Sequence, residues 1–323
     1  MNPVVQVKEI GEKVGAVQAF HDQMVHEVGK VLVGMNETVS LAVMALIAKG
    51  HILLEGVPGV AKTTLSKVLA GLLGAESQRV QFTPDLMPQD VTGATVPDRK
   101  TGEWQLRKGP VFTNILLADE INRASAKTQS ALLEAMQERQ VSIEGQSLPL
   151  PKPFLVMATQ NPIEQEGVYR LPEAQLDRFL VRIRMDYPNR AKEIEMLALV
   201  HGDQSIPAAV ADPEKILSWQ ALVDHVVAKN VVLEYVVDLV RATREHPSAL
   251  LGASPRAALA VLRLARSRAL CQGRSHVTHE DIQAIAKHVL SHRVIARPES
   301  ELDGWNGEAI VADTLGMVPV ISH

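Results

Sequence analysis

The sequence predicts an α/β fold built on a parallel sheet, followed by a segment that is almost wholly helical. Three observations favour this class. Residues 51 to 74 read as a buried strand, a glycine-rich loop and a helix in direct succession. A second buried strand, residues 115 to 120, ends in two carboxylates. From Pro188 onward, apolar residues recur at helical spacing with no clear strand. We therefore expect two domains, residues 1 to 187 and residues 188 to 323.

Composition narrows the class of protein. The chain has 323 residues, of which 46% are hydrophobic and 22% charged, as is typical of a soluble globular protein. A net charge of −4 and the lack of a long basic run disfavour nucleic acid or an acidic membrane surface as partners. Cys271 is the single cysteine, so no intrachain disulfide can form. The first 15 residues lack the apolar core of a signal peptide, and Val39 to Ala48 is too short to span a bilayer. We expect a cytoplasmic protein with no integral membrane segment.

The first elements in chain order are two helices, at residues 17 to 33 and 37 to 49, where apolar side chains recur at helical spacing. A buried strand follows at His51 to Glu55, and a helix from Thr63 to Leu73 ends at Gly74, a residue suited to a helix C-terminus. The loop between them reads GVPGVAKT, close to the phosphate-binding pattern G-x-x-x-x-G-K-[ST]. Backbone N–H groups of such a loop, and the helix N-terminus after it, hold phosphate oxygens. The candidate phosphate-binding residues are Gly56, Val57, Pro58, Gly59, Val60, Ala61, Lys62, Thr63 and Thr64.

Three positions of this loop decide its chemistry. Lys62 would neutralise the β- and γ-phosphates of a nucleotide, and the Thr63 hydroxyl would ligate Mg²⁺. Ala61 stands where the last glycine of the pattern usually lies. Alanine adds only a methyl group, so the substitution is tolerable if φ is negative at Ala61. A glycine-rich turn with a chance lysine is the alternative, which the flanking strand and helix disfavour.

Two hairpins interrupt the α/β pattern after a predicted strand at Arg79 to Thr83. Residues 94 to 109 alternate weakly around a Lys-Thr-Gly turn, and residues 139 to 151 alternate around Glu144-Gly145. A helix that Ser125 caps runs between them to Glu138. We interpret the hairpins as insertions into the α/β core.

Two further strands place polar side chains where open α/β sheets carry their chemistry, at the carboxyl ends of the strands. Asp119 and Glu120 end the run ILLADE. Asp119 would hold the Mg²⁺ environment, and Glu120 would orient and polarise the attacking water. Two solvated carboxylates at a helix start are the alternative. The buried run PFLVMATQNP contains Asn161, which could bond both the γ-phosphate and that water.

Two arginines are candidate contacts to phosphate. Arg178 lies where a short helix, residues 171 to 179, meets the last predicted core strand. It is either an ion-pair partner within the fold or a cation projected to a neighbouring subunit's nucleotide. Arg256 follows a predicted N-cap and proline, at a helix end where the dipole disfavours a cation. This position favours contact with a nucleotide phosphate over a solvated arginine.

The second domain is predicted from five helical segments, near 190 to 200, 214 to 228, 232 to 245, 254 to 271 and 278 to 292. His288 and His292 share one helix face, but no third ligand accompanies them, which disfavours a zinc site. The segment from Pro298 to His323 carries no clear pattern, and we expect a mobile tail there.

Five segments together resemble the AAA+ ATPases, and their residue sequences are similar to those of the MoxR family. The segments are GVPGVAKT, ILLADEINRA, MATQNP, LPEAQLDRF and GASPRA. The resemblance runs from about residue 30 to about residue 295. It implies a five-stranded αβα nucleotide domain with a helical lid, assembled into a ring, usually a hexamer, with ATP between subunits. It assigns the first nucleotide motif to Lys62 and Thr63, the second to Asp119 and Glu120, the sensor to Asn161, the arginine finger to Arg178 and the lid sensor to Arg256. Val33 and Gly34 lie where many such ATPases build an adenine pocket, although an ordinary helix connection is the alternative.

The resemblance also implies a role and partners. MoxR proteins are similar to chaperones: they use ATP and Mg²⁺ to mature or assemble client proteins, often inserting a metal or cofactor, with von Willebrand factor A domain partners. In the related branch of motor proteins, such hairpins face the pore. A nucleic-acid motor is the enzyme alternative, which the net charge disfavours, and a nucleotide-gated scaffold without turnover is the non-enzyme alternative. GTP is disfavoured because no N-K-x-D motif is present.

Overall fold

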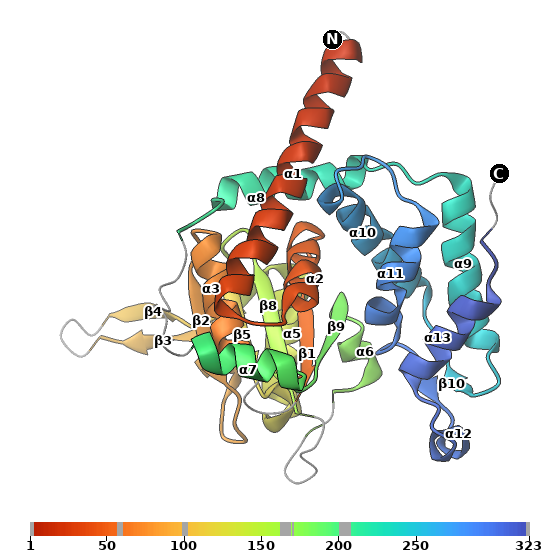
Figure 1. Ribbon diagram of the computed structural model, residues 1–323. Coiled ribbons are helices and arrows are strands. Elements are labelled where there is room, and N and C mark those ends of the chain that lie inside the picture. The colour runs from red at the N-terminus through yellow and green to blue at the C-terminus, as the bar shows by residue number, and fades with distance from the viewer. Residues whose placement is uncertain are drawn as a thin grey trace.

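The central sheet has five parallel strands, as predicted. The computed structural model describes residues 3–56, 61–98, 103–161, 169, 171–199 and 208–320. The strand order is β2-β5-β8-β1-β9, and every neighbouring pair is parallel. Because the strands run in one direction, their carboxyl ends lie at one edge of the sheet (Figure 1). The strands are β1 (Ile52–Gly56), β2 (Ser77–Gln81), β5 (Ile115–Asp119), β8 (Leu155–Gln160) and β9 (Val181–Met185).

Helices cover both faces of this sheet, because the central strands are apolar on both sides. Along β1, Ile52 and Leu54 belong to one buried cluster and Leu53 to another, as the alternation of side chains along a strand requires. The first cluster includes residues of α1 (Pro3–Val31), α2 (Asn36–Ile47) and α3 (Lys62–Leu72). The second includes residues of α5 (Ala126–Glu138). The core is therefore an αβα sandwich.

Both hairpin insertions are present, and they differ in packing. The first pairs β3 (Gly93–Pro97) with β4 (Trp104–Lys108) and projects from the body of the molecule (Figure 1). The second pairs β6 (Gln140–Ile143) with β7 (Gln146–Pro149), and its Val141 and Ile143 are buried in the core. The short helix α4 (Pro88–Thr92) directly precedes β3, and the 3-10 helix η1 (Ile121–Arg123) lies between β5 and α5.

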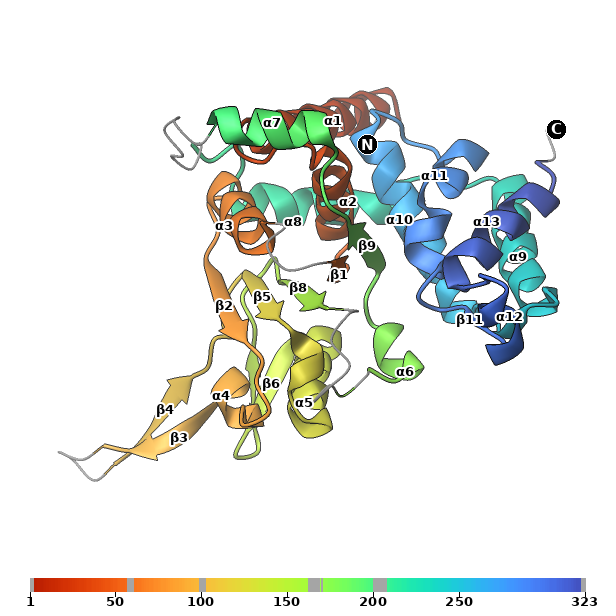
Figure 2. The same cartoon turned by 60° about the horizontal axis from the view of Figure 1, so that its bottom comes forward.

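The C-terminal part is helical, with α10 at its centre. α10 packs against α9, α11, α1 and α2, so the lid is joined closely to the N-terminal helices (Figure 2). The division at residue 187 stays a prediction. No helix of the described residues is long and apolar enough to cross a membrane. The helices are α7 (Arg190–Leu199), α8 (Pro213–Leu222), η2 (Val223–His225), α9 (Asn230–Glu245), α10 (Pro255–Cys271), α11 (His279–Leu290), α12 (Pro298–Leu302) and α13 (Gly307–Met317), beside a small sheet of β10 (Ala249–Leu251) and β11 (Ile295–Ala296).

The expected mobile tail is wrong for residues 298 to 320. α13 packs against α11 and α9, and its Ile310 and Val311 are fully buried. Asn306 caps this helix, because its side-chain oxygen accepts hydrogen bonds from the backbone N–H groups of Glu308 and Ala309. The small sheet of β10 and β11 likewise departs from the expectation of a lid without strands.

Candidate active site

The carboxyl edge of the sheet brings four of the predicted residues together. Lys62 opens α3 directly after β1, Asp119 ends β5, Glu120 follows it, and Asn161 follows β8. β8 lies between β5 and β1 in the sheet, so the three strand ends are neighbours. Asn161 is buried. This clustering follows from the parallel topology, since loops at one edge of such a sheet converge.

Lys62 supplies the positive charge of this edge. Its ammonium group donates a hydrogen bond to the carbonyl oxygen of Gly56, at 2.7 Å. Burial lowers the pKa of Lys62, and the nearby carboxylates of Asp119 and Glu120 partly offset this effect. An ammonium group has three N–H donors, so two remain for phosphate oxygens. The loop residues Val57, Pro58, Gly59 and Val60 lie outside the described part of the chain.

Ala61 corrects one expectation. Its φ is +51° and its ψ is 27°, the left-handed conformation that glycine adopts freely and alanine rarely does. The condition that φ be negative at Ala61 is therefore not met. The backbone here keeps the geometry that a glycine would give, and the methyl group of Ala61 is accommodated at the cost of local strain.

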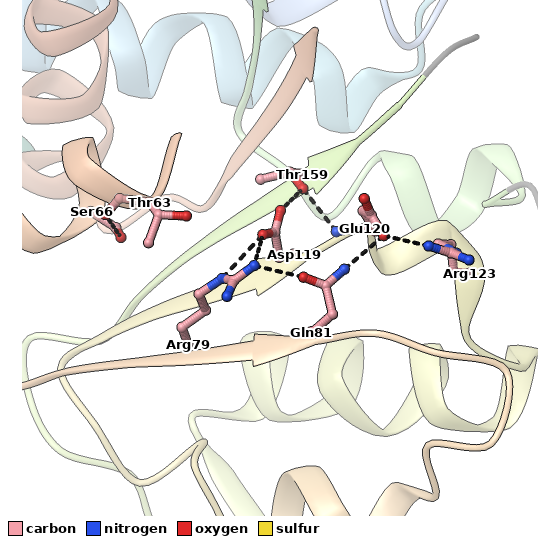
Figure 3. A network of polar contacts seen from close by, with 8 residues as sticks. All are labelled: Thr63, Ser66, Arg79, Gln81, Asp119, Glu120, Arg123 and Thr159. Carbon is pink, nitrogen blue, oxygen red and sulfur yellow. Dashed lines mark hydrogen bonds and ion pairs between the residues drawn. The ribbon is translucent and has the colours of Figure 1, made fainter. Parts of the chain in front are cut away.

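Asp119 is held by two neighbouring strands (Figure 3). The Thr159 hydroxyl on β8 donates to its Oδ1 at 2.6 Å, and the Arg79 guanidinium on β2 donates to Oδ2 from Nε at 3.1 Å and Nη2 at 2.7 Å. A carboxylate has about four acceptor positions, so these bonds leave about one. Asp119 is thus fixed in place with one acceptor position left for a further donor.

Glu120 is held by a second set of contacts. Its φ of +55° is left-handed, and its backbone N–H donates to the Thr159 hydroxyl at 2.8 Å. Its Oε2 accepts from Gln81 Nε2 at 2.7 Å and from Arg123 Nη1 at 3.0 Å (Figure 3). The strained backbone and three polar contacts fix the direction of this carboxylate, as a group that positions a water molecule requires.

Arg178 and Arg256 lie at the opposite end of the sheet. Both line a cavity of about 720 Å³ beside His51, which directly precedes β1. Arg256 pairs with Asp177 at 3.7 Å, and Arg293 pairs with the same carboxylate at 2.6 Å. Strand β1 has five residues and spans roughly 17 Å. These arginines therefore lie at the end of the sheet opposite to Lys62 of the same chain.

Comparison with known proteins places this geometry in a family. The model of the ATPase family associated with various cellular activities (AAA) matches residues 51–181, and the AAA lid domain model matches residues 241–314. Chaperone MoxR1 of Mycobacterium tuberculosis is 42% identical over 92% of this chain and 81% of its own length. The chain belongs to the MoxR family of AAA+ ATPases. It is accordingly an ATPase.

Two further comparisons agree with the fold of this MoxR-family chain. The YeaC protein of Bacillus subtilis is 47% identical over 92% of this chain and 93% of its own length. A solved structure from Cytophaga hutchinsonii, 38% identical, superposes with a TM-score of 0.91 over 98% of this chain and 99% of the other. The lid model reaches residue 314, so it includes most of α13 and agrees with the folded C-terminal segment.

Four residues that contact Asp119 or Glu120 were not predicted from the sequence of this MoxR-family protein: Thr159, Arg79, Gln81 and Arg123. Arg79 and Gln81 lie two apart on β2, so they share one face of the edge strand, and Arg79 also donates to Gln81 Oε1 at 2.7 Å. Arg123 follows Glu120 by three residues. The alternation Arg-Val-Gln at a strand end was the available signal. It becomes informative only when β2 is known to pair with β5.

Val33 and Gly34, the predicted adenine contacts, line a cavity. That this cavity binds the nucleotide stays a prediction. The cavity has a volume of about 850 Å³, and side chains of α1 and Lys192 of α7 also line it. Gly34 has φ +78°, and a Cβ there would lie 2.5 Å from Lys192 Cδ. The left-handed φ favours glycine at this position, and a larger residue would also have to displace the end of the Lys192 side chain.

His288 on α11 and His292, two residues after the end of that helix, have different partners. His292 is buried, and its Nε2 donates to the carbonyl oxygen of Phe179 at 3.1 Å. His288 lies 3.3 Å from a carboxylate oxygen of Glu37. Among the described residues, no group of three or more His, Cys, Asp and Glu side chains could hold a metal ion.

Proposed function

We propose that ATP binds at the carboxyl edge of β1, β5 and β8, and that Glu120 activates the water that attacks its γ-phosphate. The observation that carries this proposal is the convergence of Lys62, Asp119 and Glu120 at one edge. Lys62 would neutralise the phosphates, and Asn161 would bond the γ-phosphate and the water. Binding and water activation thus belong to different residues.

The donor set suits Mg²⁺ bound together with ATP. Thr63 offers a hydroxyl oxygen at the start of α3, and Asp119 offers the acceptor position that Arg79 and Thr159 leave. Oxygen ligands of this kind are what Mg²⁺ prefers, and the ion usually keeps several waters. Asp119 would therefore hold a water on the ion. When bound, the ion supplies positive charge to the phosphate oxygens.

We infer that catalysis requires more than one copy of the chain. Arg178 lies roughly a strand length from Lys62 of its own chain, so an arginine finger at this position would act on the nucleotide of a neighbour. A head-to-tail contact of this kind closes into a ring, for which we propose a hexamer. Arg256 lines the same cavity and would approach the same nucleotide.

The work done by hydrolysis is proposed from family membership. A relative carries the name chaperone, and we propose that this chain uses ATP to mature or assemble a client protein, including metal or cofactor insertion. A protein with a von Willebrand factor A domain is the proposed partner. The projecting hairpin of β3 and β4 is the proposed contact to client protein, because Trp104 and Leu106 on it are exposed.

Two substitutions test the site. Lys62→Ala should lose most nucleotide affinity, because it removes the cation at the phosphates. Glu120→Gln should keep ATP bound and lose turnover, because it removes only the base. Equilibrium binding and phosphate release measure the two effects separately, and Glu134→Gln, an exposed carboxylate on α5, is the matched control. Hydrolysis at the parent rate by Glu120→Gln would refute the assignment.

A further inference from the structure

Helix α7 exposes an apolar and acidic surface. The exposed fractions are 51% for Ile194, 41% for Met196 and 71% for Leu197, and Glu193 and Glu195 are exposed beside them. The helix has only ten residues, too few to be stable without packing. The helix lies beside α1 (Figure 2), and on the side that faces α1 its Lys192 and Glu195 line the cavity at Gly34. An apolar surface of this kind is typical of a contact with another molecule.

A basic surface lies across the molecule, on α10. Arg256, Leu259 and Arg263 follow one another at helical spacing along the wall of the cavity beside His51, and Leu259 is 69% exposed. Neither Arg263 nor Arg266 pairs with a carboxylate among the described residues. The cations that line the cavity are Lys49, Arg139, Arg178, Arg256, Arg263, Arg266 and Arg293, against the carboxylates of Asp177 and Asp224.

The positive charge of this cavity is not balanced by the carboxylates that line it in the same chain. Asp177 already pairs with both Arg293 and Arg256. Burial and the like charge of Arg263 both lower the pKa of Arg139, as expected where cations gather without counter-charges. The chain as a whole carries a net charge of −4, so the cavity is a local excess of positive charge. An acidic surface with an apolar centre would complement it.

We propose that α7 of one copy docks on α10 of a second copy. Leu197 and Met196 would pack on Leu259, and Glu193, four residues before Leu197 on the same face of α7, would face Arg263. Each helix supplies what the other lacks, because both carry an exposed leucine and their charges are opposite. The inference rests on the proposed function, in which the arginine face of one copy meets the nucleotide face of the next.

The contact has a consequence for assembly. The α7 surface follows the carboxyl end of β9, whereas the α10 surface lines the cavity at the amino end of β1, so we infer a head-to-tail contact in which each copy keeps one unused half. Copies therefore add beyond a dimer until a ring closes. A two-fold dimer, by contrast, would pair α7 and α10 reciprocally between the same two copies and leave no half unused, so it would give no cross-linked product larger than a dimer.

Cross-linking between cysteines tests the pairing. The chain's own Cys271 is buried, and burial raises its pKa to about 12, so it does not compete for maleimides. Leu197→Cys and Leu259→Cys are made on separate chains, mixed with Mg²⁺ and ATP, and treated with a short bismaleimide. We expect cross-linked pairs only in the mixture, and products larger than a dimer from the chain that carries both cysteines. Leu302→Cys, on α12 and 90% exposed, replaces Leu259→Cys in the control mixture and should give little product.

Two outcomes would overturn the inference. One is a cross-linking yield from Leu197→Cys with Leu259→Cys that is no higher than the yield from Leu197→Cys with Leu302→Cys. The other is cross-linking of Leu197→Cys with itself. ATP binding is measured on the same samples, because lost ATP binding by the parent chain would refute the proposed function, whereas bound ATP without the expected product refutes only the docking.

A second variant tests the apolar part of the contact. Leu197→Glu puts a charge where a leucine is to be covered, so it should weaken self-association about tenfold or more, measured by sedimentation. Leu302→Glu should leave association unchanged. Equal association of the two variants would contradict the docking.

Discussion

At the scale of single residues, Ala61 adopts a conformation that costs free energy. A left-handed φ costs an L-residue roughly 1–2 kcal/mol, and glycine avoids this cost but loses more entropy on folding. We predict that Ala61→Gly raises the free energy of unfolding by up to about 1 kcal/mol and keeps nucleotide affinity. Urea denaturation measures the change. Ala131→Gly, inside α5, should lower stability instead, by about 1 kcal/mol. Equal losses from both variants would contradict the assigned strain at Ala61.

His51 predicts how stability depends on pH. Its Nδ1 accepts from the backbone N–H of Val156 at 3.0 Å, and its Nε2 donates to the carbonyl oxygen of Met136 at 3.0 Å. Both bonds need the neutral ring, and burial lowers its pKa from 6.5 to about 3. Between these values the unfolded chain binds a proton that the folded chain does not. Stability is therefore lost as pH falls from about 6.5 toward 3, by at most about 1.4 kcal/mol per pH unit.

The measurement is the free energy of unfolding of the parent and of His51→Gln at pH 7.5, 6.5 and 5.5. The variant should be less stable at pH 7.5, because one buried bond is lost, but its stability should fall less on acidification. Burial also lowers the pKa of His292, which is present in both proteins and leaves part of the slope. Identical slopes in the two proteins would refute a neutral His51.

The candidate site divides into residues that sequence patterns place and residues that they do not. Asp119 ends a strand, and Lys62 and Asn161 come after strands. Since parallel strands share an edge, their meeting could be predicted. Arg79 and Gln81 depend on β2 lying next to β5, which no local pattern specifies. Their contacts became visible only in the folded chain. The catalytic roles of all these residues remain predictions.

At the scale of elements, the two hairpins should respond differently to truncation. Trp104 on β4 is 70% exposed, whereas Ile143 on β6 is 9% exposed and packs in the core. We predict that Ile143→Ala lowers the free energy of unfolding by about 2 kcal/mol or more, while Trp104→Ala changes it by less than about 0.5 kcal/mol. Denaturant unfolding of both variants measures this. A large loss from Trp104→Ala would favour a packing role for the first hairpin over a client contact.

The elements also show where sequence patterns were insufficient. The five expected lid helices are present as α7 to α11, because each has a long apolar periodicity or a cap. α13 was missed, since its Asn-Gly start resembles a turn and its two glycines weaken a helical pattern. Packing of Ile310 and Val311 against neighbouring helices stabilises it. Tertiary contacts of this kind override weak local propensity.

At the scale of the whole molecule, the two ends of the sheet carry the two halves of one proposed site. Lys62 and Glu120 lie at the carboxyl edge, and Arg178 lies at the amino end of β9, on the sheet's outer strand. The fold class and the ATPase activity followed from the sequence and are confirmed by family membership. The separation of the arginines from the phosphate-binding loop of their own chain could be seen only in the three-dimensional structure. That separation makes assembly part of the proposed mechanism.

The central claim is therefore that Arg178 acts on the nucleotide of a neighbouring copy. Arginine fingers contribute about 10³ to 10⁵ in rate, so Arg178→Ala should nearly abolish hydrolysis with a modest loss of ATP affinity. Glu120→Gln should be inactive for a different reason. An Arg178→Ala subunit keeps an intact pocket, and a Glu120→Gln subunit keeps an intact finger, so interfaces that pair the two are complete.

The decisive measurement is phosphate release by an equal mixture of these two inactive proteins, once mixed assemblies have been demonstrated by pull-down of a tagged partner. Random mixing makes about a quarter of the head-to-tail interfaces complete, so we predict recovery of up to about a quarter of the parent rate. Mixing Glu120→Gln with the double variant Glu120→Gln/Arg178→Ala should recover none. Mixed assemblies that recover no activity would contradict the account and leave Arg178 as a residue that acts only within its own chain.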